Sequence, residues 1–408
     1  MTPSAKLLPA SIPQREKTLT ARVQLAVKAY VRLWGARCLR FGQCFFFFLP
    51  IQRNKLAVYL HARRGYGCNL KYIVEAVLHS NPAAKVVWIT PFPDAVAALC
   101  ARGIRVVKLN TLPHWWHQFT SKAILISDAL PASVRLRRGQ IVMNAWHGGM
   151  NYKHIGPKYC RFDHPAQAKN FAAVNVQPHH YFSGSRFFTE DVCASFGFDP
   201  GVFRPIGMAR NDLFFADMRP FREVIRKHFG LKTDDKIALY APTFREDKCE
   251  HFFDLDVKRF LKALNIRFGG HWKLLYRNHY FVPSSGASSD MIDASSYEDM
   301  SELLAATDAL LTDYSSCLWD FALTGRPSFI YATDLEHYQQ DERAFALPPE
   351  QWPCPVCSSN ETLEQHVLTF DPDLHRKRLE THLSACGSYD DGHAAARAAT
   401  IVNAALTS

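Results

Sequence analysis

The sequence predicts an α/β protein made of two halves, each built on a parallel sheet, that face a common cleft. Short apolar runs alternate with helix-like segments from residue 55 onward, as they do in repeated βα units. The chain of 408 residues is too long for one ordinary core, and a charged helical stretch over 213–231 separates two alternating sets. We therefore expect two Rossmann-like domains, 49–215 and 216–408, preceded by an N-terminal segment over 1–48.

The first half is predicted from its elements in order. The expected strands are "KLAVYLH", "KVVWIT", "RVVKLN", "KAILISD" and "GQIVMNAW", and the helix-like segments between them include "GYGCNLKYIVEAVLHSN" and "DAVAALCARG". The tract "HHYFSGSRFFTEDVC" adds a further strand and helix. Apolar runs of this length, bounded by glycine and polar turns, are typical of strands that are buried on both faces.

The second half repeats the pattern. Its expected strands begin "KIALYAPTFRED", "HWKLLYRNHYF", "DALLTDYSS" and "PSFIYATD", and "FLKALNIRF" and "CLWDFALTG" are expected as helices. The final stretch, "HAAARAATIVNAAL", predicts a closing helix.

Charge and cysteine content narrow the classes of function. A formal charge of +10 and a pI near 9.0 favour anionic partners: a nucleotide, a polyphosphate, nucleic acid or an anionic membrane. The chain has no GxGxxG fingerprint and no Walker loop, which argues against dinucleotide binding and P-loop phosphoryl transfer. It has no recognisable nucleic-acid-binding module either, so we expect no nucleic-acid partner. The eleven scattered cysteines fit a reducing cytosol, and "CPVC" at 354–357 is read as a loop because no second ligand pair accompanies it. We expect no metal.

The N-terminal segment is basic and amphipathic. Five cations are interleaved with apolar residues at helical spacing over 20–40, and the block "CFFFFLPI" follows. No run reaches the roughly 18 apolar residues of a membrane span. The segment therefore predicts either a helix lying on an anionic membrane surface or a helix packed on its own protein.

"NAWHGG", at 144–149, is the first candidate for chemistry. His147 would lie at the carboxyl end of a buried strand, where open α/β sheets bind ligands. Gly148 and the glycine after it allow a turn or a close approach. The alternative is a hydrogen-bonded core histidine.

"LLTDYSSCLWDF" is the second candidate. Thr312, Asp313, Ser315 and Ser316 lie between a buried strand and a helix, where hydroxyls and unpaired backbone N–H groups can bind an anion such as a pyrophosphate. Alternatively, one serine is only a helix cap.

Further polar groups follow other strands of the second half or lie in the connector, the stretch over 207–231 that joins the two halves. Arg277 and His279 alternate at a strand end, and an arginine beside a histidine suits a phosphate. Thr243 and Arg245 end another strand, and the connector motif "GMARND" carries Arg210 and Asn211.

Seven motifs in this order, "WHGG", "YFSGS", "IGMARND", "YAPTFRED", "YRNHY", "LLTDYSSCLWDFALTGRPSFIY" and "DLEHYQQDERAF", resemble the CDP-glycerol glycerophosphotransferase family of teichoic-acid and capsule polymer synthesis. The likeness covers roughly 50–370. It implies a glycosyltransferase-B-like fold, a CDP-activated polyol donor, a polymeric or lipid-linked acceptor, and peripheral attachment at the cytoplasmic face of the membrane. We expect the implied reaction to use no cofactor other than the CDP-activated polyol, which is the donor substrate.

The resemblance also implies residue roles. His147 and His279 match the family's catalytic histidines. The resemblance implies that Arg277, Thr312, Asp313, Ser315 and Ser316 bind the donor. Beyond the resemblance, Thr243 and Arg245 are further candidates for donor binding, and Gly148, Arg210, Asn211 and Asp320 are candidates for substrate binding. The sequence therefore predicts transfer of glycerol phosphate from CDP-glycerol with release of CMP. CDP-ribitol as donor and a sugar-nucleotide glycosyltransferase of the same fold remain alternatives.

Overall fold

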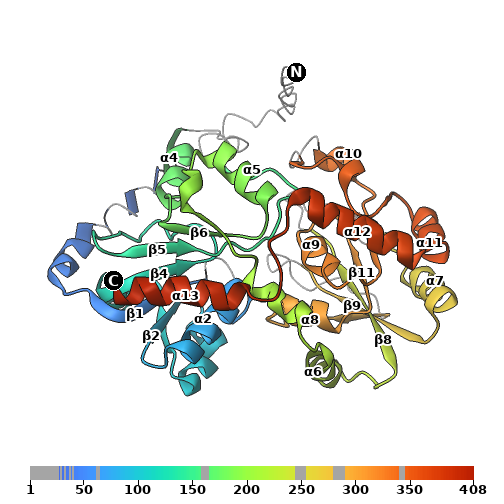
Figure 1. Ribbon diagram of the computed structural model, residues 1–408, viewed down its shortest axis with the longest axis horizontal. Coiled ribbons are helices and arrows are strands. Elements are labelled where there is room, and N and C mark those ends of the chain that lie inside the picture. The colour runs from blue at the N-terminus through green and yellow to red at the C-terminus, as the bar shows by residue number, and fades with distance from the viewer. Residues whose placement is uncertain are drawn as a thin grey trace.

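The computed structural model describes residues 27, 30, 31, 34, 35, 38, 41–60, 65–157, 165–243, 254–278, 290–339 and 345–408. They form two lobes that lie side by side, each with a central sheet and flanking helices (Figure 1). All strand pairs within both sheets are parallel. The predicted α/β class with two parallel sheets is thus confirmed.

The first lobe contains a seven-stranded sheet in the order β3-β2-β1-β4-β5-β6-β7. Its strands are β1 (Gln52–Tyr59), β2 (Lys85–Thr90), β3 (Arg105–Lys108), β4 (Ser121–Ile126), β5 (Ile141–Asn144), β6 (His180–Ser183) and β7 (Phe203–Pro205). Its α-helices before the connector are α2 (Cys68–Ser80), α3 (Leu112–Thr120), α4 (Pro165–Val174) and α5 (Arg186–Phe196), and the 3-10 helices are η1 (Gln43–Phe48), η2 (Pro93–Arg102), η3 (Pro200–Val202) and η4 (Ala209–Phe215). The segment "DAVAALCARG", expected as an ordinary helix, is the 3-10 helix η2, with non-helical backbone at Val96.

The second lobe contains a six-stranded sheet in the order β10-β9-β8-β11-β12-β13. Its strands are β8 (Asp235–Ala241), β9 (His271–Tyr276), β10 (Met291–Asp293), β11 (Ala309–Thr312), β12 (Ser328–Tyr331) and β13 (Val356–Cys357). Its helices are α6 (Arg219–Phe229), α7 (Val257–Phe268), α8 (Met300–Ala306), α9 (Cys317–Ala322), α10 (Leu335–His337), η7 (Pro349–Gln351), α11 (Asn360–Leu368) and α12 (Pro372–Cys386).

Buried strand faces explain why the sequence shows apolar runs rather than alternation. In β1 every residue from Lys55 to Tyr59 is buried, and in β11 all four residues are buried. A parallel sheet with helices on both faces leaves neither side of such a strand in water. Lys55 is the exception in β1, because it is a buried cation next to the apolar run 56–59.

The closing helix, α13 (Ala394–Thr407), returns to the first lobe. Figure 1 shows it in red along that lobe, whereas α12 covers the second lobe. Its buried face, including Ala398, Val402 and Leu406, joins the core that contains β1 and α2. The range 216–408 therefore includes a helix that packs on the first sheet.

The chain thus passes between the lobes twice, once between β7 and α6 and once between α12 and α13. Hydrogen bonds connect these two passages. The backbone N–H of Met208 donates to Oδ1 of Asp390 at 2.7 Å, and the carboxylate of Asp212 accepts the N–H groups of Ala394 and Ala395 at 2.9 and 2.8 Å. Gly207 has a φ of +87°, and a Cβ there would lie 2.9 Å from the carbonyl oxygen of Tyr389. Burial raises the pKa of Asp390 to about 7.

Most of the predicted N-terminal amphipathic segment lies outside the described residues. Of its apolar positions, Val27, Tyr30, Val31 and Trp34 are described and exposed. Within the described residues, no helix is both long enough and apolar enough to span a membrane.

The phenylalanine block is divided between packing and exposure. The ring of Phe47 lies 5.1 Å from that of buried Phe119 in α3, and the ring of Phe46 lies 5.9 Å from it. Phe45 and Phe48 are exposed. Half of this block is therefore part of the first lobe and not a free tether.

The two cysteines of the "CPVC" segment are buried, whereas Pro355 between them is exposed in the loop before β13 (Val356–Cys357). Sγ of Cys354 lies 3.2 Å from the hydroxyl of Ser328, and Cys357 lies in β13 with Sγ 3.0 Å from Nδ1 of His366. In the part of the chain that the structure describes, no group of three or more His, Cys, Asp or Glu side chains could hold a metal ion.

Candidate active site between the two lobes

A cavity of about 180 Å³ lies between the lobes, at the carboxyl ends of both sheets. The first lobe and connector contribute Leu60, Gly67, Cys68, His147 and Arg210, and the second lobe contributes Ala241, Pro242, Arg277, Asn278, Ser295, residues 298–301, residues 315–317 and Asp320. Six of the predicted site residues are in this lining: His147, Arg210, Arg277, Ser315, Ser316 and Asp320. Parallel strands bring them together because all their carboxyl ends meet at one edge of each sheet.

His147 follows β5 and is oriented by its neighbours. Its ring lies against that of Trp146, tilted by 31° with centroids 4.4 Å apart, and Nδ1 lies 3.1 Å from the carbonyl oxygen of Ser127. A carbonyl oxygen only accepts, so Nδ1 carries the proton of the neutral ring and Nε2 keeps its lone pair. The half-buried imidazole is therefore in the tautomer that a general base requires.

The backbone before His147 is held in an unusual conformation. Trp146 has a φ of +47°, a region that non-glycine residues rarely occupy. Buried Asn69 donates from Nδ2 to the carbonyl oxygens of Ala145 and Trp146, at 2.9 and 3.1 Å. Its Oδ1 accepts the N–H of Arg210 at 3.1 Å. Asn69 thus connects α2, the loop that carries His147, and the connector.

Arg210 connects the same loop to the second lobe. Nη1 donates to the carbonyl oxygen of His147 at 2.6 Å, and Nη2 donates to Oδ2 of Asp320 at 2.6 Å. Both side chains are buried, and the pKa of the guanidinium is raised, since Asp320 and Cys68 outweigh the lowering effect of burial. These contacts orient both side chains in the cavity lining, and the substrate-binding role that the sequence suggested for them stays a prediction. Asn211 is fully buried and lies outside the cavity lining.

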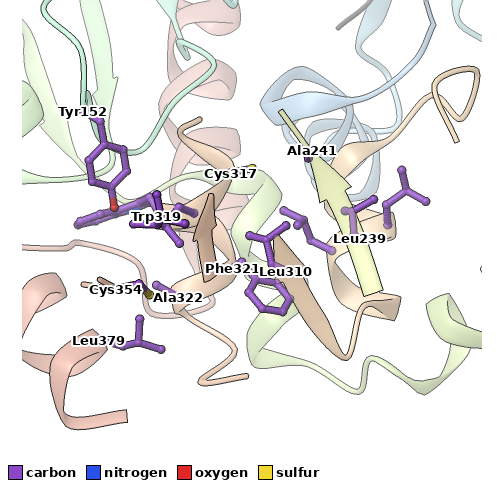
Figure 2. Close-up of a cluster of buried hydrophobic side chains, with 14 of the residues drawn as sticks. Tyr152, Leu239, Ala241, Leu310, Cys317, Trp319, Phe321, Ala322, Cys354 and Leu379 are labelled. Carbon is purple, nitrogen blue, oxygen red and sulfur yellow. The ribbon is translucent and has the colours of Figure 1, made fainter. Parts of the chain in front are cut away.

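The two glycines after His147 allow the lobes to approach closely. A Cβ on Gly149 would lie 2.6 Å from Nε1 of Trp319 in α9, whereas a Cβ on Gly148 would lie 3.7 Å from the hydroxyl oxygen of Ser316. Neither glycine has a positive φ. Trp319 is fully buried and, as Figure 2 shows, lies next to Tyr152 of the first lobe within a cluster of mostly second-lobe side chains.

The second lobe faces His147 with hydroxyls and a cation. Ser315 and Ser316 precede the short helix α9, and the Ser315 hydroxyl accepts weakly from the N–H of Cys317 at 3.4 Å. Ser316 makes no side-chain cap. The guanidinium of Arg277 donates to the carbonyl oxygens of Tyr297 and Glu298, at 2.7 and 3.4 Å, which orients it in the cavity wall.

Three predicted donor-binding residues lie behind this wall. The Thr312 hydroxyl donates to the carbonyl oxygen of Ala241 at 2.7 Å. Both carboxylate oxygens of Asp313 accept the N–H of Thr243, at 2.9 and 3.0 Å. These contacts tie the ends of β8 and β11 together, and none of the three residues lines the cavity. Arg245 and His279 lie outside the described residues.

An ion-pair cluster beside the cavity was absent from the sequence prediction. Nζ of Lys71, in α2, lies 2.8 Å from Oδ2 of Asp299 and 2.5 Å from Oε1 of Glu302, at the start of α8. The hydroxyl of Tyr72 donates to the same Oδ2 at 2.9 Å. These contacts join the lobes. Nothing in the local sequence marks them, because a lysine on an amphipathic helix is usually only solvated.

Comparison with known proteins gives a family. The family model of CDP-glycerol:poly(glycerophosphate) glycerophosphotransferases matches residues 43–404. A teichoic acid poly(glycerol phosphate) polymerase of Staphylococcus epidermidis is 27% identical over 349 residues, which are 81% of this chain and 48% of that protein. A teichoic acid ribitol-phosphate primase of Bacillus spizizenii is 23% identical over 372 residues, 88% of this chain and 93% of that protein.

The fold has a counterpart of known structure. The wall teichoic acid polymerase TagF superposes with a TM-score of 0.78 at 23% identity, over 96% of this chain and 98% of that one. The chain nevertheless spans only about half the length of several curated relatives that it matches.

Proposed function

Because the chain belongs to the CDP-glycerol:poly(glycerophosphate) glycerophosphotransferase family, we propose that it transfers glycerol phosphate from CDP-glycerol to a hydroxyl of a polymeric or lipid-linked acceptor. The acceptor oxygen bonds to the glycerol-side phosphorus, the bond from that phosphorus to the bridging oxygen breaks, and CMP leaves. The observation that carries the proposal is the cavity, where a correctly oriented histidine faces the hydroxyls and the guanidinium of the other lobe.

His147 acts as the general base. An alcohol is a poor nucleophile at neutral pH, so its proton must be removed as it attacks. Nε2 of His147 accepts that proton while Nδ1 stays bonded to the Ser127 carbonyl, which stabilises the charged imidazolium. General base catalysis of this kind typically contributes about 10²–10⁴-fold to a rate.

Arg277, Ser315 and Ser316 bind the diphosphate of the donor. Hydrogen bonds from a guanidinium and from hydroxyls stabilise negative charge on phosphate oxygens, and this electrostatic contribution dominates phosphoryl transfer. We propose that His279 and Arg245 assist from the adjoining segments. Thr312, Asp313 and Thr243 position the loop that carries the serines, through the backbone contacts already described.

Binding of donor and acceptor by different lobes makes the spacing of the lobes important. The base comes from the first lobe and the phosphate-binding groups come from the second. The ion pairs Arg210–Asp320 and Lys71–Asp299 bridge the lobes at the cavity and hold that spacing.

CDP-ribitol is the second candidate donor. The ribitol-phosphate primase matches this chain over nearly all of its own length, whereas the glycerol phosphate polymerase is matched over about half. The two donors differ in the length of the polyol and share the CDP group that the cavity would bind.

We further propose that the protein works at the cytoplasmic face of the membrane, as a peripheral protein on an anionic surface. The basic N-terminal segment and the exposed rings of Phe45 and Phe48 support this placement. The proposed reaction uses the CDP-activated polyol as its donor substrate and no other cofactor, and it involves no nucleic acid.

CMP release from purified protein tests the function. Protein is incubated with CDP-glycerol or CDP-ribitol and a glycerol phosphate-primed acceptor. We expect release with CDP-glycerol, a loss of at least about 100-fold in His147→Gln, and donor affinity within a few fold of wild type. His271→Gln is the matched control, because His271 begins β9 and lies at the end of that strand away from the cavity. Wild-type turnover by His147→Gln removes it as the base, and release only with CDP-ribitol selects the second donor.

A further inference from the structure

A second basic site lies away from the cavity, in a groove along the edge of the first sheet. The groove has a volume of about 720 Å³ and runs beside β3, the outermost strand of that sheet. Its lining consists of Cys100, residues 103–108, Thr111, Pro113 and His117. None of these residues belongs to the cavity between the lobes.

Three cations on three neighbouring strands share one face of the sheet: Lys85 and Arg105 begin β2 and β3, and Lys55 lies within β1. Lys55 of β1 pairs in register with Lys85 of β2, so both side chains point to the same face. Arg105 of β3 pairs with Val87, two residues after Lys85, and therefore points to that face as well. Lys85 and Arg105 are exposed, and Arg105 lines the groove.

Lys55 is the unusual member of this group because it is buried. Its exposed fraction is 4%, and Nζ donates to the hydroxyl of Thr120 at 2.5 Å. Burial, Arg105 and Lys85 together lower the pKa of Lys55 to about 8. No carboxylate forms an ion pair with Lys55, Lys85 or Arg105 in the described structure. A buried cation surrounded by cations is costly unless an anion offsets it.

His117 adds an unsatisfied group to the groove wall. Its ring nitrogen Nδ1 is buried and makes no hydrogen bond in the described structure. Burial, followed by the charges of Lys55 and Arg105, lowers the pKa of His117 to about 4, so the ring is neutral at pH 7. A neutral imidazole can donate one hydrogen bond to an anion in the groove.

Protection of an edge strand explains only part of this arrangement. Exposed lysine and arginine residues on an outer strand prevent pairing with another chain, and Arg105 and Lys108 would serve that purpose. Lys55 cannot, because it lies two strands further in and is covered by α3. Its charge adds to the positive potential of Arg105 and Lys85 beside the groove, and no acidic side chain of the described structure offsets it.

We propose that the β3 groove is a second binding site, for the phosphate groups of a phosphodiester chain, and that the growing polymer is its ligand. The polymer's identity rests on the proposed function, whereas the anion site rests on the cations alone. The groove ends at Lys108 and Thr111, on the same sheet edge as Leu60 of the cavity lining. Two strand spacings, about 10 Å, separate β3 from β1, so a chain that leaves the cavity can continue into the groove.

Binding of a synthetic glycerol phosphate hexamer to the full chain, without donor, tests the proposal. We expect Lys85→Ala/Arg105→Ala to bind the hexamer at least about tenfold more weakly than wild type in low salt, as loss of hydrogen bonds to charged groups implies. Lys227→Ala/Lys377→Ala removes two exposed cations of the second lobe and is the matched control, for which we expect wild-type affinity. CMP release onto a monomeric acceptor should stay unchanged in both variants.

A second variant and a second probe complete the test. The hexamer should raise the midpoint of thermal unfolding of wild type but not of Lys55→Met. Equal hexamer affinity in the two double variants overturns the proposal. So does a groove variant that loses only its binding to phosphatidylglycerol vesicles, which would make the groove a lipid site. Hexamer binding without any CMP release would instead reject the proposed function and leave the anion site standing.

Discussion

Replacing Gly149 by alanine should separate the two lobes locally. The added Cβ would lie 2.6 and 2.7 Å from Nε1 and Cδ1 of Trp319 and 3.1 Å from Cγ of Met208. Ordinary carbon contacts begin near 3.5 Å, so the indole or the loop must move by about 0.8 Å. Trp319 is fully buried within a cluster of packed side chains, which leaves it little room to move. Overpacking of this kind costs about 1–3 kcal/mol, and we expect a value of about 2 kcal/mol or more.

The neighbouring glycine provides the control. A Cβ on Gly148 would meet the carbonyl oxygen of Met150 at 3.4 Å and Ser316 at 3.7 Å, which are ordinary contacts. Thermal unfolding followed by circular dichroism should show Gly149→Ala about 4–8 °C below wild type, with Gly148→Ala within a degree or two.

CMP release adds a second measurement for the same pair. Gly149→Ala should lose turnover, because the shift moves His147 relative to Ser316. Adding Trp319→Phe to this variant removes the indole atoms that collide with the new Cβ and should recover part of the lost stability. Equal melting temperatures of Gly149→Ala and Gly148→Ala would show that the lobes do not approach closely at Trp319.

Two further changes test the contacts between the lobes. Asp320→Asn leaves the buried Arg210 charge unpaired and should lower the free energy of unfolding by about 3–5 kcal/mol. The double variant Arg210→Met/Asp320→Asn should lose less free energy of unfolding than the two single variants together. Additive losses in a double-mutant cycle measured by denaturant unfolding would contradict the pairing. Burial raises the pKa of Asp390 from 3.8 to about 7, so the folded chain binds this proton more tightly than the unfolded chain, and stability falls as pH rises from about 4 to 7. Asp390→Asn should remove that part of the slope in melting temperature between pH 4 and 8, and an unchanged slope would show that another group is responsible.

The strands and the meeting of the site residues could be predicted from the sequence. Buried parallel strands leave continuous apolar runs, and each run is followed by the polar residues that end at one sheet edge. His147, Arg277 and Ser316 were therefore predictable as neighbours although they are far apart in the chain.

Other features depend on partners that local sequence does not identify. An alanine-rich closing helix fits either lobe, and only the packed core assigns α13 to the first. Asn69 looks like any polar residue at the start of a helix, because its role depends on backbone carbonyls 76 and 77 positions away. The roles of Thr312 and Asp313 are likewise set by backbone groups of another strand.

The return of α13 to the first lobe has a consequence for synthesis on the ribosome. The strands of the first sheet emerge early, but the helix that covers β1 and α2 follows η4 by about 180 residues. At about 5–20 residues per second, the uncovered face waits roughly 10–40 s in the cell. During that interval its apolar surface is open to chaperones and to other nascent chains. Truncation before Ala394 would make that exposure permanent and should yield a protein that aggregates although its cavity residues are all present.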